Sequence, residues 1–258
     1  MHGIALIAAI ALTLCAGRPA AAERLVVSLS KHRVAVTSSF VGEDLVLFGT
    51  VEPDTGKTAL RASYDVVVTV AGPPHNLHTR RKERVAGVWV NVGSREFVGV
   101  PSYLAILSNR PVRDIARPDV LRPLQVGLDN YLLRQRIGPD IADTVRDDPF
   151  RIAFIDLEKE HGLYRQSGDA VTFLTPTVFR TTVVLPSNVR TGDYSVDVKL
   201  FAGGQLTARA NSALEVIKTG VEEYVANAAR QYGLLYGLAT SLMALVIGWF
   251  ASVVFRRD

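Results

Sequence analysis

Residues 194–216 read YSVDVKLFAGGQLTARANSALEV, and this stretch decides the fold class. Its two halves, 194–201 and 205–216, alternate apolar with polar side chains or are rich in β-branched ones, as strands are. Between the halves stands Ala202-Gly203-Gly204-Gln205. Two adjacent glycines favour a two-residue hairpin turn, because glycine tolerates the positive φ angles that the turn requires. The stretch therefore predicts a long β-hairpin.

Similar strand-like segments flank this hairpin on its N-terminal side. They are Leu25–Leu29, Arg33–Thr37, Leu45–Val51, Tyr64–Ala71, Arg84–Val92, Glu96–Val100, Val171–Leu174 and Phe179–Leu185. Turn residues separate them at 52–56, 71–74, 186–188 and 191–193. This spacing predicts a mainly β protein with an immunoglobulin-like β-sandwich. The Cys…Trp…Cys mark of antibody domains is absent, so the prediction concerns the architecture alone.

The middle of the chain lacks this alternation. Residues 101–165 are rich in Arg, Asp and Leu, and prolines interrupt them repeatedly. Three segments within them predict helices, namely Ser102–Ser108, Arg122–Ile137 and Pro149–Glu160. We therefore expect a helical insertion between two groups of sandwich strands.

The C-terminal region predicts one membrane span. Residues 233–255 contain no charged side chain, and about 20 apolar residues suffice to cross a bilayer core. Arg256 and Arg257 follow at once, which predicts a cytoplasmic tail over 256–258. The residues from Thr219 to Glu222 fit a capping box, so a juxtamembrane helix over 219–232 is expected to continue into the span as one helix.

One side of the expected span carries small residues. They are Gly233, Gly237, Ser241, Ala244 and Gly248. Small side chains let two membrane helices approach closely, so this side could pack against a partner helix or a second copy. The alternative is that Gly and Ser are simply common in spans.

The N-terminal region predicts a secretory signal peptide over residues 1–22. An uncharged apolar run is followed by Gly17, Arg18 and Pro19, and then by the Ala20-Ala21-Ala22 cleavage site. Export of the N-terminus agrees with a cytoplasmic C-terminus. Residues 23–218 are therefore expected to form a periplasmic domain, held by a single span in the inner membrane.

Composition excludes several classes of protein. The chain has 258 residues, of which 48% are hydrophobic and 21% charged, so it is not a disordered chain. Cys15 is the only cysteine, which excludes a disulfide scaffold. The net charge of +4 is small for this length, and an exported domain would not meet chromosomal DNA, so no nucleic-acid partner is expected.

The densest polar cluster spans residues 75–84 and is expected to form a loop. His75 and His78 could share a divalent metal if the fold supplied a third ligand. The cations Arg80, Arg81, Lys82 and Arg84 could instead dock an anion or a protein partner. The third possibility is an ordinary solvated loop, and no metal site is predicted.

Trp89 is the only tryptophan outside the expected span. It could pack in the core between the sheets, or it could be an exposed aromatic anchor for a partner.

No catalytic motif is present. The carboxylates between Asp143 and Glu160 alternate with basic residues, as on an ordinary ion-paired helix surface. Nucleophile elbows, P-loops, zinc-protease and dinucleotide motifs are absent. The expectation is a protein that is not an enzyme and uses no cofactor, with a hydrolase as the residual alternative.

The chain resembles the putative transmembrane protein family of alphaproteobacteria. The resemblance covers nearly the whole chain and rests on the leader, the C-terminal span and five internal stretches. These stretches are residues 25–30, 45–51, 64–68, 72–91 and 100–103. The family is named for its topology, so the resemblance implies an inner-membrane protein with a periplasmic domain and supplies no catalytic residues. It also suggests a sulfite-exporter-type transporter as the partner.

The expected function is therefore a membrane-anchored periplasmic binding or assembly module, accessory to another inner-membrane protein such as a transporter. The alternative is a periplasmic receptor for a small anion or divalent metal that uses His75, His78 and the neighbouring cations.

Overall fold

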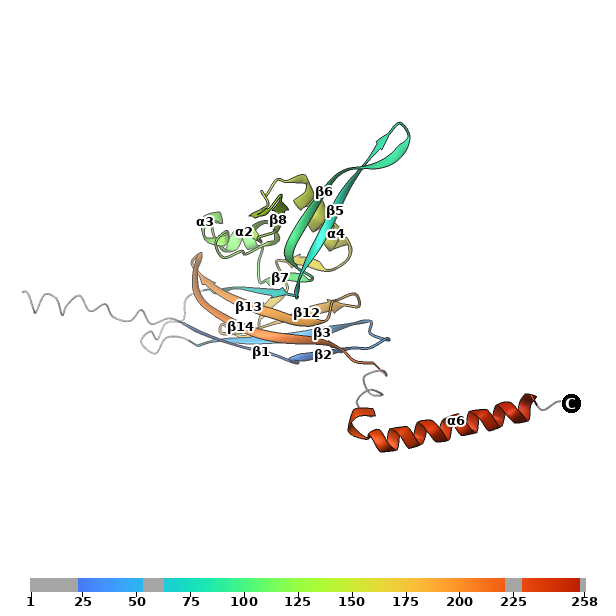
Figure 1. The fold of residues 1–258 in the computed structure, drawn as a ribbon. Coiled ribbons are helices and arrows are strands. Elements are labelled where there is room, and N and C mark those ends of the chain that lie inside the picture. The colour runs from blue at the N-terminus through green and yellow to red at the C-terminus, as the bar shows by residue number, and fades with distance from the viewer. Residues whose placement is uncertain (1–22, 53–62, 221–228, 256–258) are drawn as a thin grey trace, which may run out of the picture.

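Figure 1 presents the computed structural model of the chain, which describes residues 23–52, 63–220 and 229–255. In these residues two β-sheets stack face to face. The first sheet contains, in spatial order, β1 (Arg24–Leu29), β3 (Gly42–Glu52), β12 (Val178–Pro186) and β11 (Val171–Phe173). The second contains β10 (Tyr164–Ser167), β7 (Leu104–Ser108), β4 (Asp65–Ala71), β13 (Gly192–Ala202), β14 (Gln205–Lys218) and β2 (Arg33–Val36). The expected sandwich architecture is confirmed.

The alternation of the strands builds the core between these sheets. Every second residue of β3 and β12 points inward and is buried, whereas its neighbours are more exposed. The inner face of the first sheet is formed by Leu25, Leu45, Leu47, Val51, Phe179, Val183 and Leu185. These side chains pack against Val66, Val68, Val70, Val196, Val198, Leu200 and Leu214 of the second sheet.

The expected Gly-Gly hairpin joins β13 to β14. Gly203 and Gly204 have φ angles of 58° and 79°, as a type I′ turn requires. Antiparallel pairing then runs from Ala202 opposite Gln205 to Gly192 opposite Val216.

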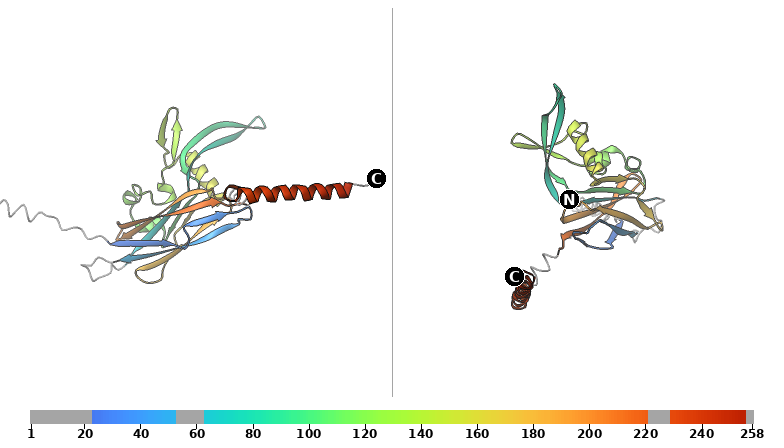
Figure 2. Two further views of the ribbon diagram at one scale, coloured as in Figure 1. Left: turned by 60° about the horizontal axis from the view of Figure 1, so that its bottom comes forward. Right: turned by 90° about the vertical axis from the view of Figure 1, so that its right-hand side faces the viewer.

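A third layer covers the outer face of the second sheet. It contains α2 (Val112–Ile115), α3 (Pro118–Leu121), the 3-10 helix η1 (Leu128–Asn130), α4 (Pro149–Glu160) and a third sheet of β5 (Pro74–Val85), β6 (Val88–Pro101), β8 (Arg134–Ile137) and β9 (Asp140–Asp143). The right-hand view of Figure 2 shows this layer above the sandwich. Its own core includes Val67, Phe97, Leu104, Ile106, Ile115, Leu121, Phe154 and Phe201. The strand β4 is consequently buried on both faces.

The expected helical insertion is only partly helical. The helix over Pro149–Glu160 is confirmed as α4, whose N-cap Asp148 accepts hydrogen bonds from the backbone amides of Phe150 and Arg151. The helix predicted over Ser102–Ser108 was wrong, because Leu104–Ser108 form β7. That strand is buried on both faces, so it reads as a continuous apolar run without alternation.

The helix predicted over Arg122–Ile137 was also wrong. Its periodic leucines fall on separate short elements, with α3 ending at Leu121 and η1 beginning at Leu128. Gly127 between them has a φ of 100°, which a right-handed helix cannot contain. The last residues form β8, which pairs with β6 and β9.

The predicted strand over Arg84–Val92 was wrong in its boundaries. Ala86 and Gly87 have φ angles of 49° and 87°, and they turn the chain between β5 and β6. The predicted loop over residues 75–84 is consequently part of β5. This strand and β6 belong to the third sheet and not to the sandwich.

The C-terminal helix α6 spans Gly233–Phe255. Residues 229–231 are helical, but Tyr232 is a bend, so the single continuous helix that we expected is interrupted there. Thr219 still donates from its backbone amide to the carbonyl of Val36 at 2.9 Å, which extends the pairing of β14 with β2. The signal peptide, Cys15, residues 221 and 222 of the capping box and the arginines of the tail lie outside the described residues.

Candidate functional site: the β5–β6 arm and the membrane helix

The strands β5 and β6 form a long hairpin that stands away from the domain (Figure 1). Their pairing runs from Pro74 opposite Pro101 to Val85 opposite Val88. The type I′ turn at Ala86 and Gly87 closes the far end. We call this hairpin the arm.

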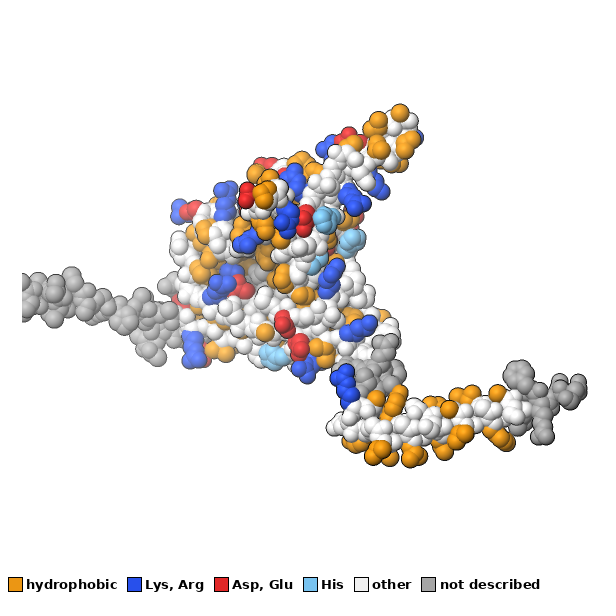
Figure 3. Space-filling model, in the orientation of Figure 1, with side chains coloured by type: hydrophobic (Ala, Val, Ile, Leu, Met, Phe, Trp, Pro, Cys, Tyr) orange, Lys and Arg blue, Asp and Glu red, His pale blue; other side chains and the backbone are white. Residues whose placement is uncertain are grey.

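The far end of the arm is apolar and exposed. The exposed fraction is 54% for Val85 and 66% for both Val88 and Trp89. Together with Val90 and Val92, which are also exposed, these residues form what we call the arm tip. Figure 3 shows apolar side chains gathered at this end. An apolar cluster of this kind on a projecting element marks a surface for interaction.

Trp89 therefore lies outside the core, as an exposed aromatic side chain. Sequence reasoning missed its valine neighbours as candidate residues, because alternating valines look the same in a half-buried strand and in a projecting hairpin. The signal that could have found them is Ala86-Gly87, a hairpin turn between two valine-containing runs.

Four cations of β5 run back along the strand from the level of Trp89. We call them the basic stem: Arg80, Arg81, Lys82 and Arg84. Residues directly opposite each other in a ladder share a face of the hairpin. Arg84 lies opposite Trp89, and Lys82 lies opposite Asn91. Arg81 forms an ion pair with Glu83 on the same strand. The structure thus keeps the predicted docking cations together.

The two histidines of the arm both lie on β5, on either side of an irregularity in the register. His75 is half-buried near the base of β5, and its Nδ1 lies 3.1 Å from the carbonyl oxygen of Val100. Burial lowers the pKa of His75, and the nearby Arg190 guanidinium lowers it further. His78 lies opposite Glu96, beyond an irregularity in the register. Among the described residues, no group of three or more His, Cys, Asp or Glu side chains could hold a metal ion.

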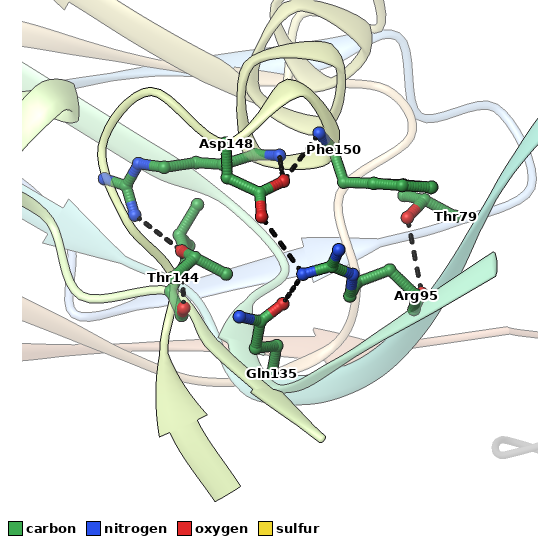
Figure 4. Close-up of polar contacts among 8 residues, drawn as sticks. Thr79, Arg95, Gln135, Thr144, Asp148 and Phe150 are labelled. Carbon is green, nitrogen blue, oxygen red and sulfur yellow. Dashed lines mark hydrogen bonds and ion pairs between the residues drawn. The ribbon is translucent and has the colours of Figure 1, made fainter. Parts of the chain in front are cut away.

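The base of the arm is fixed to α4 by a polar cluster, drawn in Figure 4. Arg95 of β6 donates from Nη1 to Oδ2 of Asp148 at 3.0 Å, and also to Oε1 of Gln135. Its guanidinium carbon lies 4.8 Å from the ring centre of Phe150, a cation–π contact. Below this cluster, the rings of Phe97 and Phe154 stack at 4.8 Å. The arm therefore projects from a rigid base.

Two carboxylates of the insertion have structural partners. Asp148 caps α4 and binds Arg95, and Asp156 accepts from Lys159 at 3.2 Å. Glu158 is buried, and this burial raises its pKa. Near α2 and α3 lies a cavity of about 420 Å³ whose titratable lining residues are Arg113, Asp129 and Arg146. This lining offers no pairing of a nucleophile with a general base.

The helix α6 is long and apolar enough to cross a membrane between Gly233 and Ser252. From Gly233 to Ser252 its side chains are exposed, with nothing else in the described chain covering them. The small residues lie along one side of the helix, because each is three or four residues, about one helical turn, from the next: Gly233, Gly237, Ser241, Ala244 and Gly248. The hydroxyl of Thr240 donates to the carbonyls of Tyr236 and Gly237, both at 3.0 Å, so this polar group has partners within the helix.

A family model described as "Putative transmembrane protein (Alph_Pro_TM)" matches residues 24–257 of this chain. The chain belongs to this family. The match includes the sandwich, the third layer with its arm, and α6, so Alph_Pro_TM describes one chain that combines a β-rich domain with a candidate span.

Two further comparisons give this Alph_Pro_TM protein no functional assignment. No curated protein matches it. Among solved structures, it is similar to the N-terminal domain of the Streptococcus gordonii adhesin Sgo0707, with 7% sequence identity and a TM-score of 0.29. That similarity covers 75% of this chain and 32% of the adhesin chain, so the protein spans about a third of the structure that it matches.

Proposed function

We propose that this protein is a non-enzymatic module, anchored in the inner membrane, that assembles with another membrane protein such as a transporter. In this proposal residues 1–22 are a cleaved signal peptide, and the domain over 23–218 faces the periplasm. Arg256 and Arg257 hold the C-terminus in the cytoplasm, as the excess of Lys and Arg in cytoplasmic segments suggests.

The observation that carries this proposal is the uncovered small-residue side of α6. Lipid tails give apolar helices no hydrophobic reason to associate, so membrane helices meet where small residues allow close backbone contact. Gly237, Ala244 and Gly248 provide such a surface. The span carries no ionisable side chain, so it is better suited to packing than to moving protons or ions by itself.

The domain outside the membrane supports an assembly role in two ways. The cavity near α2 and α3 lacks a catalytic pairing, and several exposed apolar side chains gather at the arm tip. The alternative function, a receptor for a small anion or divalent metal, finds little support. Arg81 is already paired with Glu83, and His75 contacts a backbone carbonyl.

Site-specific photo-crosslinking in intact cells tests the assembly. A photoreactive residue replaces Ala244 on the small-residue side, and in a matched control it replaces Val246, which lies on the opposite side of the helix. We expect a crosslink from position 244 to one distinct membrane protein and none from position 246. Equal labelling at both positions, or a crosslink only to a second copy of this chain, contradicts the proposal.

The placement of the domain has its own test. Protease added to spheroplasts should digest residues 23–218, and the mature chain should begin at Glu23. An unprocessed N-terminus on a domain that is digested only after lysis would contradict the periplasmic placement.

A further inference from the structure

The arm tip exposes apolar side chains at the end of a hairpin that nothing else in the described chain covers. Val85 and Val88 face each other across the turn, and Trp89 follows on the other face of the hairpin. Five exposed apolar side chains in one place are unfavourable in water unless another apolar phase covers them. We therefore expect another apolar surface to cover this end of the hairpin.

The order of residues from the turn resembles the layers of a membrane surface. Val85 and Val88 stand next to the turn, Trp89 and Arg84 follow opposite each other, and Lys82 lies two residues further back on the same face as Arg84. In membranes the aliphatic residues lie in hydrocarbon, tryptophan lies at the interface, and Lys and Arg reach the headgroups. Residues 80–84 contain the four cations of the stem and one carboxylate, Glu83, so this segment carries a net positive charge that anionic phospholipids attract.

The arm also lies at the end of the domain that is tethered to the membrane. Figure 1 and the left view of Figure 2 both show the arm tip and the final residues of β14 at one end, with the start of β1 at the other. The chain leaves the domain at Lys218, and the candidate span begins at Gly233. The connection between Lys218 and the span therefore holds this end of the domain near the bilayer.

We propose that the arm tip inserts into the leaflet that faces the domain, in the same bilayer that α6 spans, while the basic stem binds the anionic headgroups of that leaflet. The inference rests on the proposed function only for placing the domain on the outer face of the membrane. The insertion is shallow, because the cations of the stem stop it at the headgroups. A weak intrinsic affinity suffices, because the span already holds the arm at a high local concentration of lipid.

The insertion turns the single span into a two-point attachment. The rigid base of the arm, where Arg95 binds Asp148, transmits the contact at the tip to the whole domain. The domain then keeps one orientation relative to the membrane. A fixed orientation would present the same surface to a neighbouring membrane protein.

Tryptophan fluorescence of the purified full-length chain in vesicles tests this inference. Trp249→Phe leaves Trp89 as the only tryptophan. The vesicles are made of phosphatidylcholine, with or without phosphatidylglycerol, and the reference is the same protein held by a lipid-free amphipathic polymer. We expect Trp89 emission to shift to the blue in vesicles, with strong quenching by lipids brominated on their acyl chains and weak quenching by aqueous acrylamide.

Two variants and a control sharpen this test. Val88→Asp places a carboxylate at the tip and should abolish both the blue shift and the quenching by brominated lipid. Lys82→Gln with Arg84→Gln should lower the ratio of protected to accessible Trp89 by about fivefold per charge removed, only in vesicles with phosphatidylglycerol. Val145→Asp changes an exposed valine elsewhere on the domain and should have no effect.

Several outcomes overturn the inference. Trp89 that remains open to acrylamide in all vesicles excludes lipid insertion and favours a protein partner for the tip. Protection that rises with the ratio of protein to lipid indicates a second copy as the occupant. The proposed function is tested separately, because the crosslink at position 244 is measured in cells and requires no tip residue.

Discussion

Arg95 donates to the carboxylate of Asp148 at 3.0 Å, and this ion pair joins the base of the arm to the first turn of α4. Oδ2 of Asp148 binds Arg95, while Oδ1 accepts from the backbone amide of Phe150 at 2.8 Å. One side chain therefore both caps a helix and holds a strand. The ion pair therefore ties the projecting arm to α4.

We expect Asp148→Ala to lower the free energy of unfolding by about 1–3 kcal/mol, because it removes both the helix cap and the ion pair. Asp148→Asn should cost less, since asparagine still caps a helix. Chemical denaturation of the full chain in detergent micelles, followed by circular dichroism, measures both values. Asp140→Ala, at an exposed position of β9, is the control. Equal losses for Ala and Asn would show that the cap contributes nothing.

Arg151 is a buried cation, whereas the sequence predicted it on an ion-paired helix surface. Its exposed fraction is 3%. It donates to Oγ1 of Thr144 at 3.0 Å and to the backbone carbonyls of Leu128, Asp129 and Tyr131 at 3.2, 3.3 and 2.7 Å. The guanidinium thus supplies hydrogen-bond donors to the backbone carbonyls of the irregular segment that precedes β8.

Arg151→Leu should lower the free energy of unfolding by roughly 2–4 kcal/mol, because several buried acceptors lose their donor together. Arg151→Lys should retain part of this stability, since one ammonium group cannot reach all four acceptors. Arg122→Leu, at an exposed position, should change the stability by about 0.5 kcal/mol or less. A similar small loss for Arg151→Leu would contradict the role assigned to the guanidinium.

Gly49 has no room for a side chain. A Cβ there would lie 2.1 Å from Cζ of Phe179, whose fully buried ring covers the glycine from the neighbouring strand. Gly49→Ala should therefore destabilise the sandwich by about 1–3 kcal/mol through overpacking. The cost should be smaller in a Phe179→Leu background, and a double-mutant cycle measures the difference. Additive losses would show that the ring does not cause the strain.

Asp197 gives the domain a dependence on pH. Burial works against its ionisation, but hydrogen bonds from Arg209 and Lys199 outweigh that effect and lower its pKa. The bonds from Arg209 are 2.7 and 3.1 Å long, and Lys199 is almost fully buried. A lowered folded-state pKa means that the ionised carboxylate stabilises the fold above the ordinary aspartate pKa of about 4. This stability is lost as the pH falls through the folded pKa.

Asp197→Asn should therefore cost roughly 1–3 kcal/mol at neutral pH, in part because Lys199 loses its buried partner. The gap between this variant and the unmodified chain should narrow as the pH falls below about 4. Denaturation curves across the acid range, with Asp140→Asn as the exposed control, measure this gap. A gap that stays constant with pH would contradict the role of the ionised carboxylate.

The arm tip should contribute little to folding. Trp89→Ser should leave the Tm within about 2 °C of the unmodified chain, because an exposed side chain loses few contacts when it is removed. Thermal unfolding in micelles measures this value. A large fall in Tm would mean that Trp89 packs against the domain, and the tip would then be unavailable to lipid or to a partner.

Elements that depend on neighbouring residues could be predicted from the sequence. The hairpin of β13 and β14, the helix α4 and the candidate span are local features, and the sequence predicted each of them correctly. The histidines and cations of residues 75–84 lie on the strand β5, whereas this segment was expected to be a loop. Its strand partner β6 became clear only from the structure, since Ala86-Gly87 had been placed inside a strand.

The sequence by itself determined the mainly β class and the position of the candidate span, because alternation, Gly-Gly turns and a long uncharged run each depend only on neighbouring residues. Tertiary structure alone decided that residues 104–108 form a central strand and not a helix, because an apolar run buried on both faces carries no period. It also decided that Val85, Val88 and Trp89 face solvent, since the burial of a strand depends on what packs against it.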